Sequence, residues 1–312
     1  MQQIISSVLP IFLIILLGKL IRSYWLKSDE FWRGLEALSY YLLFPGVLFN
    51  YISCADIGSS SVTRLVIALV ISTIFTASCL VFAQKRFEIE GKVFTSIFQG
   101  GIRYNSYMLF GLGDALYGKD GMIIISVIAA YMIVLTNFLS VLAFSVYAPL
   151  DDEISKKRGV SQWSIFIKNL VMNPLIISSL AGFIFNNFGI ELSDSLQKTT
   201  QTLANSALSV GILCVGAGLK LNLSSFNKFA ILISCTTKLV IMPAISFVIF
   251  RVAGIDGLAY SVGLLYSSLP TATNSYLLSK QLGGDSDAMS SIITIGILLS
   301  VLSLAIFTYI LC

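Results

Sequence analysis

Ten apolar segments dominate this chain of 312 residues, and each is about as long as a bilayer is thick. A transmembrane helix needs about 20 mostly apolar residues, and inside lipid every backbone hydrogen bond must be made by the protein itself. Only 12% of the residues are charged, whereas soluble domains have about 25%. The sequence therefore predicts an all-α integral membrane protein with ten transmembrane helices, at residues 3–21, 33–53, 63–83, 93–117, 121–147, 163–186, 196–218, 229–250, 257–279 and 286–311.

Basic residues in the loops predict how these helices are oriented. Most of them, such as Arg22, Lys85 and Arg86, lie in loops 1–2, 3–4, 5–6, 7–8 and 9–10. The opposite loops contain only Arg64, Lys119, Lys198 and Arg251. Cytoplasmic loops carry the excess of lysine and arginine, so both termini are predicted outside, in a multi-pass protein of the inner (cytoplasmic) membrane.

The hydrophilic stretch DDEISKKRGVSQ at residues 151–162 divides the chain into two halves of five segments each. Five is odd, so residues 163–312 enter the membrane in the orientation opposite to that of residues 1–150, which predicts an inverted repeat joined by a cytoplasmic linker. The tripeptide Asn-Ser-Tyr occurs in the fourth segment of each half, beginning at Asn105 and at Asn274. A Gly–Asp element follows each tripeptide, GKDG at 118–121 and GGDS at 283–286.

Both fourth segments, which are helices 4 and 9 of the chain, contain residues that interrupt a helix. Two glycines precede Arg103 in the first, and Pro270 stands among hydroxyl residues in the second. Proline removes a backbone donor and clashes with the preceding turn. Interrupted helices at matching positions of two halves indicate the binding site of a transporter, so helices 4 and 9 are predicted to be broken and to cross at mid-membrane.

The crossing supplies the candidate binding residues. Placing an arginine such as Arg103 at mid-span costs about 2.5–3.5 kcal/mol. Arg103 is therefore expected to bind substrate, to form a structural pair with Asp114 or a backbone carbonyl, or to reach one membrane surface. The amides of Asn105 and Asn274 either bind substrate or bridge the broken helix ends. Lys238 is interpreted as a residue near a helix end whose ammonium reaches the surface. The complete set of predicted substrate-binding residues is Arg103, Asn105, Pro270, Thr271, Asn274, Asn50 and Asn137, of which the last two also suit hydrogen bonding between helices.

Other functions have little support in the sequence. The chain has no histidine, and its five cysteines show no metal-binding spacing, so no catalytic residue and no metal site is predicted. The stretch GLGD at 111–114 matches a pattern of intramembrane aspartyl proteases, but that chemistry needs a second aspartate. The net charge of +4 comes from loop residues and does not indicate a nucleic-acid partner. A passive channel or receptor is not excluded by composition.

Several motifs resemble one family along the whole chain. They are LLFPGVLFN, GIRYNSYMLFGLGDALYG and LTNFLSV in the first half, and NPLIISSLAGFIF, LSVGILCVGAGLKL, TKLVIMPAISF and SLPTATNSYLLSKQLGGDSDAMSSIITIGILLS in the second. In this order they resemble a bacterial member of the auxin efflux carrier family, within the bile acid/arsenite/riboflavin transporter superfamily. The resemblance implies a scaffold domain from helices 1, 2, 6 and 7 and a transport domain from helices 3–5 and 8–10. It also implies an organic anion as substrate, and a homodimer as in some plant members.

Together these features predict a secondary active transporter of small organic anions, carboxylates or auxin-like acids, working by alternating access at the crossing of helices 4 and 9. It is not predicted to be an enzyme or to need a cofactor. The coupling ion is open between H⁺ and Na⁺: carboxylates in the spans, such as Glu36 and Asp114, fall near helix ends, whereas oxygen ligands at a broken helix suit sodium. The alternatives are a sodium-coupled symporter of the related bile acid type, a passive channel and an intramembrane protease.

Overall fold

The computed structural model describes residues 2–53, 55, 60–148, 167, 168, 170–219 and 227–311, so the predicted linker at 151–162 lies outside the described residues. The described residues form helices and contain no strand. Five helical stretches are long and apolar enough to cross a membrane, namely Ser60–Phe87, Gly91–Tyr147, Asp194–Gly218, Lys228–Val252 and Ser286–Leu304. Further apolar helices, such as Pro174–Asn187, are shorter. These features are those of an all-helical, multi-pass membrane protein.

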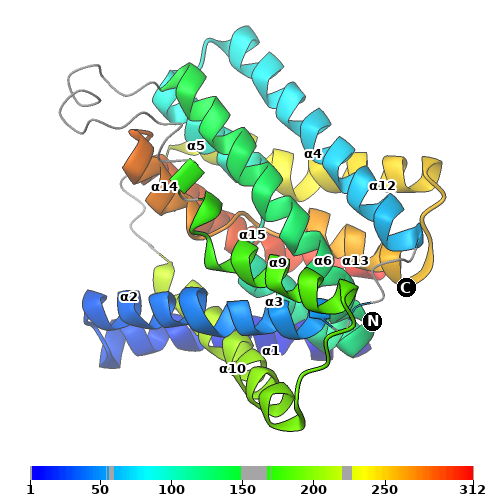
Figure 1. Ribbon diagram of the computed structural model, residues 1–312. Coiled ribbons are helices and arrows are strands. Elements are labelled where there is room, and N and C mark those ends of the chain that lie inside the picture. The colour runs from blue at the N-terminus through cyan, green and yellow to red at the C-terminus, as the bar shows by residue number, and fades with distance from the viewer. Residues whose placement is uncertain are drawn as a thin grey trace. The chain divides into compact units, whose positions relative to one another are not determined.

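The chain forms two compact units, and the first comprises Met1–Thr63, Ser106–Tyr131 and Val171–Leu219. In this unit α1 packs along α10, and α3 packs against both α9 and α10 (Figure 1). Its helices are α1 (Gln2–Leu20), the π-helical turn η1 (Ile21–Trp25), α2 (Asp29–Leu38), the π-helical turn η2 (Ser39–Leu43), α3 (Phe44–Ser53), α9 (Pro174–Asn187) and α10 (Asp194–Gly218).

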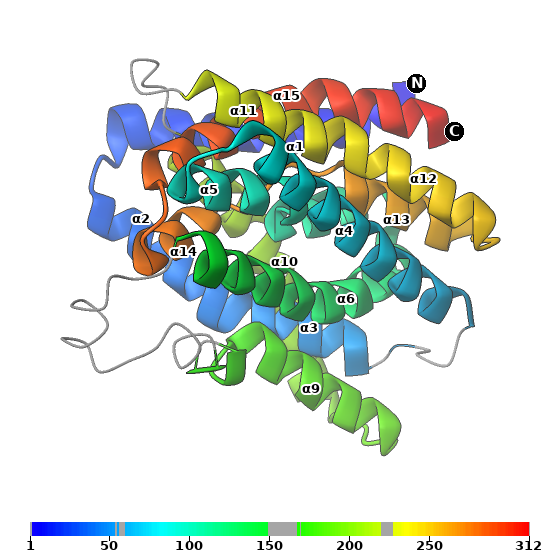
Figure 2. The ribbon, with the colours of Figure 1, turned by 90° about the horizontal axis from the view of Figure 1, so that it is seen from above.

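The second unit comprises Arg64–Asn105, Met132–Leu170 and Lys220–Cys312. Here α11 packs against α5 and α15. Helices α11 and α15 lie side by side in Figure 2. The helices are α4 (Ser60–Phe87, from Arg64 onward), α5 (Gly91–Ile102), α11 (Lys228–Thr236), the π-helical turn η4 (Thr237–Ile241), α12 (Met242–Val252), α13 (Gly257–Ser268), α14 (Ser275–Leu282) and α15 (Ser286–Leu311). Helix α6 (Ser106–Tyr147) contributes residues to both units. Scaffold and transport domains are defined by how they move relative to each other. The division of the chain into these two domains therefore stays a prediction.

Each of the repeated Gly–Asp elements contains a glycine with positive φ, although the ψ angles of the two glycines differ. Gly118 interrupts α6 with φ of 55°, and Gly283 ends α14 with φ of 80°. Glycine adopts such left-handed backbone angles without the steric cost that a Cβ would add. In each half of the sequence a glycine therefore ends the helix that follows Asn-Ser-Tyr.

Two prolines are accommodated by wide helical turns. Pro45 and Pro243 each stand as the second residue of a helix that follows a π-helical turn, η2 and η4. In those turns the amide of Phe44 donates to the carbonyl of Ser39, and the amide of Met242 to that of Thr237. A proline ring clashes with the carbonyl of the preceding turn, and the extra residue per turn gives it room. The helices continue through both prolines instead of ending there.

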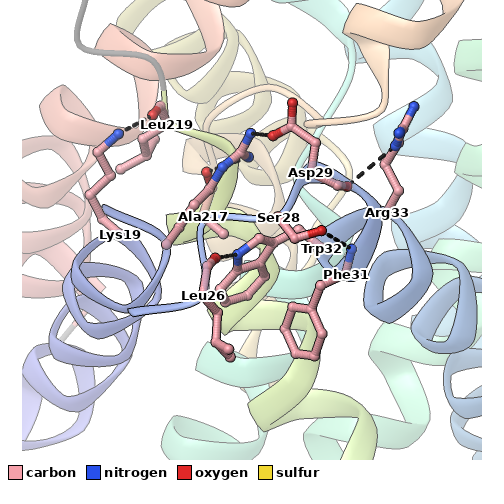
Figure 3. A network of polar contacts seen from close by, with 10 residues as sticks. Lys19, Leu26, Ser28, Asp29, Phe31, Trp32, Arg33, Ala217 and Leu219 are labelled. Atoms are coloured by element: carbon pink, nitrogen blue, oxygen red, sulfur yellow. Dashed lines mark hydrogen bonds and ion pairs between the residues drawn. The ribbon is translucent and has the colours of Figure 1, made fainter. Parts of the chain in front are cut away.

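Basic side chains from the end of α1 cap the carboxyl end of α10 (Figure 3). Lys19 Nζ donates to the carbonyl of Leu219 at 2.7 Å, and Arg22 Nη1 donates to that of Ala217 at 2.8 Å. Arg22 also forms an ion pair with Asp29 at 2.6 Å. The last carbonyls of a helix lack partners within the helix and form the negative end of its dipole. Lys19 and Arg22 therefore stabilise the end of α10, in addition to the orienting role inferred from the sequence for Arg22.

Helices α1 and α10 approach each other through glycines. A Cβ atom at Gly216 would overlap the carbonyl of Ile15, and one at Gly18 would overlap the carbonyl of Leu213. Small residues allow such close backbone approach, which is how helices in lipid gain packing energy. Because the overlapping atoms belong to the backbone, no side-chain rotation can relieve the clash.

We expect Gly216→Ala to destabilise the first unit by about 1–3 kcal/mol, the usual cost of adding volume to a packed site. The matched control is Gly218→Ala in the same helix, because a Cβ at Gly218 meets nothing within 4 Å. Thermal unfolding of the two variants in the same detergent measures the difference. If Gly216→Ala unfolds at the temperature of Gly218→Ala, the two helices are not held at this distance.

Candidate functional site

The helix that begins with α5 is interrupted at residues 103–105. Gly100 and Gly101 remain helical, and α5 ends one residue later at Ile102. Arg103 then adopts an extended conformation with φ of −79° and ψ of 159°, and the next helix, α6, begins at Ser106. The interruption predicted from the sequence is present, but it begins at the arginine and not at the glycines.

The second interruption covers residues 269–274, between α13 and α14. Leu269 is extended, with ψ of 149°, as expected for a residue that precedes a proline. Pro270 has no amide hydrogen to donate, so α13 cannot continue past Ser268 without losing a hydrogen bond. This break is therefore a local consequence of the sequence.

The two interruptions meet inside the second unit. The amide of Asn105 donates to the carbonyl of Pro270 at 2.8 Å, and the hydroxyl of Thr271 donates to the carbonyl of Gln99 at 3.4 Å. The ring of Tyr104 lies 4.5 Å from that of Tyr266, between centroids. Backbone groups left without helical partners by one break are thus satisfied by the other break, as buried backbone requires. We call residues 103–105 and 269–274, with the side chains that bond to them, the crossing.

Arg103 links the two broken helices. Its side chain is 6% exposed, and Nη2 donates to Asn274 Oδ1 at 3.0 Å while Nη1 donates to Gln99 Oε1 at 3.2 Å. Gln99 in turn donates to the hydroxyl of Ser279 on α14 at 3.0 Å. Both of these acceptors are neutral side chains, and together they hold the guanidinium in place. A guanidinium held in this way presents a positive charge with a fixed orientation.

The first backbone amides of α14 already have hydrogen-bond partners. The amides of Ser275 and Leu277 donate to the carbonyls of Ala272 and Asn274 at 3.2 and 3.1 Å. The positive end of the helix dipole remains. The side-chain hydroxyl of Ser275 is buried and has no hydrogen-bond partner among the described residues. Donors for a ligand at this end therefore come from side chains and not from the helix amides.

The structure contradicts the interpretation of Lys238 as a residue near a helix end whose ammonium reaches the surface. It lies in η4, near the middle of the helical stretch Lys228–Val252, and its side chain is only 1% exposed. Its Nζ contacts Met242 Sδ at 3.1 Å and the carbonyl of Ser267 at 3.4 Å. Ten residues of helix span about 15 Å, which is more than a lysine side chain can reach. Lys238 is therefore a buried cation next to the end of α13.

The predicted site residues fall into two groups. Arg103, Asn105, Pro270, Thr271 and Asn274 come together at the crossing, where Asn105 is buried and Asn274 is exposed.

Asn50 belongs to the first unit, where it donates to Gln201 Oε1 at 2.8 Å and accepts from the hydroxyl of Thr200 at 3.3 Å. These contacts are those of an amide that joins two helices. Asn137 is half-buried on α6, and no hydrogen bond in the described part of the chain connects it to the crossing. Binding by any of these residues stays a prediction.

Sequence reasoning missed Gln99, Ser279 and Tyr266. Gln99 offered a signal, because it is a polar residue inside an apolar segment and stands one helical turn before Arg103. Ser279 and Tyr266 offered none, because hydroxyl residues are common in membrane helices. Their proximity to the crossing depends on how α13 and α14 pack.

The chemistry of the crossing suits a small anion. A buried guanidinium, an exposed amide and the positive end of α14 all favour a negative group. The crossing has no histidine or cysteine, and its contacts involve neutral acceptors, so it offers no nucleophile paired with a base. The arrangement favours binding over bond-breaking chemistry.

Comparison with known proteins identifies similar sequences. A sequence model of the family described as "Membrane transport protein" matches residues 3–308. An "Uncharacterized transporter" of Methanothermobacter thermautotrophicus is 24% identical over 311 residues, which cover 98% of each chain. A "Putative malonate transporter" of Rhizobium meliloti is 25% identical over 310 residues, covering 96% of this chain and 93% of that protein. An uncharacterized transporter of Methanocaldococcus jannaschii is 21% identical over 316 residues and 97% of both chains.

Proposed function

The chain belongs to the membrane transport protein family, that is, to the auxin efflux carriers, and from this premise we propose that it is a secondary active transporter of small organic anions. The observation that carries the proposal is the crossing, where two interrupted helices place Arg103 and Asn274 within 3.0 Å of each other. Interrupted helices at matching positions of two halves are typical of carriers that bind substrate near the middle of the bilayer.

The proposed architecture has ten membrane helices in two inverted repeats of five. The shared Gly–Asp turns after each Asn-Ser-Tyr, at Gly118 and Gly283, support this repeat. So does the similar position of the two interruptions, one in each half of the chain. Alternating access would then expose the crossing to one side of the inner membrane at a time. No chemical step is part of this function, so the protein is not proposed to be an enzyme.

The proposed substrate is a carboxylate. A guanidinium recognises a carboxylate through two parallel hydrogen bonds, and Arg103 is held in place at the crossing by Gln99 and Asn274. One relative carries the name of a malonate transporter, which makes malonate the first compound to test. Thermal-shift measurements on purified protein with malonate, succinate, acetate and an indole acid test the class, because a ligand of the folded state raises the unfolding temperature. Stabilisation by none of these acids contradicts the proposal.

The alternatives differ in what else they require. A sodium-coupled symporter would need sodium in the external medium, and a passive channel would move substrate without accumulating it. Uptake of labelled malonate into liposomes, with and without sodium and with and without an ion gradient, separates these cases. The same assay identifies the coupling ion, H⁺ or Na⁺.

Cysteine labelling tests the proposed orientation, in which both termini lie outside. In a parent protein without its own cysteines, a membrane-impermeant maleimide should modify Ser60→Cys in intact cells and leave Ser155→Cys unmodified. Ser155 lies outside the described residues, and both positions are assigned from the basic loops. The reverse pattern would overturn the orientation. It would also remove the support that the predicted orientation gives to the inverted repeat.

A further inference from the structure

Lys238 is a charge that the proposed binding site does not use. Three groups surround its ammonium: Met242 Sδ at 3.1 Å, the carbonyl of Ser267 at 3.4 Å and the ring of Tyr266, whose centroid lies 5.5 Å away. None of these groups carries a negative charge. Burying an ammonium without an anion costs several kcal/mol of folding free energy, so a permanently charged Lys238 with only a structural role would destabilise the folded protein.

Among the residues that the structure describes, no acid that could serve as a partner faces Lys238 from the helices packed against η4. Elements α5, α11, α12, α13 and α15 pack against η4. Their described titratable or charged side chains are Lys92, Lys228, Cys235, Arg251, Tyr260, Tyr266 and Asp287, with Arg103 directly after α5. The only acid among them, Asp287, is exposed in the first turn of α15, and among the described residues no ion pair joins it to Lys238.

The ammonium is connected to the crossing by two routes. Ser267 is the last residue but one of α13, and three residues further on the carbonyl of Pro270 accepts from Asn105. Tyr266, which contacts Lys238, also packs against Tyr104, with ring centroids 4.5 Å apart and ring planes tilted by 54°. The carboxyl end of α13 is the negative end of a helix dipole, and Lys238 supplies a cation there. In transporters with discontinuous helices, such carboxyl ends can coordinate the coupling cation.

We propose that Lys238 is the proton-binding residue of an anion–proton symport at the crossing, an inference that rests on the proposed function. An anion bound beside Arg103 provides the negative charge that the surroundings of Lys238 lack, so anion and proton each favour binding of the other. When the anion leaves, an N–H bond of the ammonium breaks, its electron pair stays on nitrogen, and water in the opened cavity accepts the proton. The ammonium occupies the carbonyl end of α13, so sodium is not required.

The first experiment measures proton uptake on binding. Titration calorimetry of purified protein with malonate, in buffers of different ionisation enthalpy, counts the protons taken up per malonate bound. We expect uptake by the parent and by Lys228→Met, a control that removes an exposed lysine from the same helical stretch. Lys238→Met and Lys238→Arg should bind malonate with no such uptake, because methionine carries no proton and arginine does not release one.

The second experiment measures coupling in liposomes with internal pH recorded by a dye and with potassium as the only metal cation. One coupled proton at a gradient of one pH unit supports about a tenfold accumulation of malonate. We expect this accumulation, with malonate-dependent proton entry, in the parent and in Lys228→Met. In Lys238→Met and Lys238→Arg the accumulation and the proton entry should both be lost.

Three results would overturn the inference. The first is unchanged proton uptake in either Lys238 variant. Lys238→Arg keeps the positive charge at the end of α13, so it tests coupling even if Lys238→Met does not fold. A parent protein that needs sodium contradicts it without any variant. If the parent binds and moves no carboxylate, the proposed function fails, and the inference with it. If the parent moves malonate and the variants stay coupled, the inference alone fails.

Discussion

Replacing Arg103 by alanine is expected to reduce the affinity for a carboxylate such as malonate by about 30-fold to several thousandfold. Removing one member of a buried, hydrogen-bonded charge pair costs about 2–5 kcal/mol, and each 1.4 kcal/mol is a factor of ten. Arg103 is 6% exposed, and its guanidinium is fixed by Gln99 and Asn274. Alanine removes both the charge and the two-point geometry. Titration calorimetry with malonate measures the loss directly.

Two further variants interpret this result. Arg103→Lys should recover part of the affinity, because lysine restores the charge but not the planar pair of donors. Arg251→Ala is the control, since Arg251 is an exposed arginine of the same unit that lies over the rings of Phe247 and Tyr260. Its removal should leave affinity unchanged. If Arg103→Ala lowers the unfolding temperature but binds malonate as the parent does, the arginine is structural and the assignment is wrong.

Replacing Asn274 by aspartate is expected to weaken anion binding by about a hundredfold or more, and to weaken it further than Asn274→Ala does. Asn274 Oδ1 lies 3.0 Å from Arg103 Nη2, so a carboxylate at this position would pair with the guanidinium. The pair cancels the positive charge, and the new negative charge repels the ligand, which costs several kcal/mol. The folded protein should be at least as stable as the parent, because an ion pair replaces a neutral hydrogen bond.

Asn227→Asp is the matched control for this substitution. Asn227 also stands at the start of a helix in the same unit, where its Oδ1 accepts from the amide of Ala230. Aspartate serves equally well at such a position, so affinity and stability should both stay near the parent values. Calorimetry and thermal unfolding of the two variants make the comparison. Equal affinities for Asn274→Asp and Asn274→Ala would show that no anion binds next to Asn274.

The outline of the site could be predicted because its breaks are local. Pro270 ends α13 through its own ring and missing amide, and Leu269 is extended because a proline follows. The position of the first break was less clear, since Gly100 and Gly101 are helical and the chain leaves the helix only at Arg103. Glycine permits many conformations and requires none. At the crossing, Pro270 therefore located its break more sharply than Gly100 and Gly101 located theirs, although helices continue through Pro45 and Pro243.

The environment of Lys238 could not be predicted. In the sequence it is a basic residue five positions before a proline, which fits a helix end as well as a helix middle. The structure places it in a π-helical turn through which the helix continues, and buries it against α13. Burial depends on which helices surround a residue, and no local pattern contains that information. Asn50 shows the same limit, since its sequence position did not identify Thr200 and Gln201 as its hydrogen-bond partners.

The sequence by itself determined that the chain forms apolar helices for a membrane, and where proline must interrupt one of them. Both follow from short-range physics, because hydropathy, helix length and the missing amide of proline act over one segment at a time. Only the tertiary structure decided which polar groups meet. Arg103 and Asn274 are 171 positions apart, and Thr271 and Gln99 are 172 positions apart, yet each pair is joined by a hydrogen bond. Such pairs form because buried polar groups must find partners, and the packing of helices determines which partners are within reach.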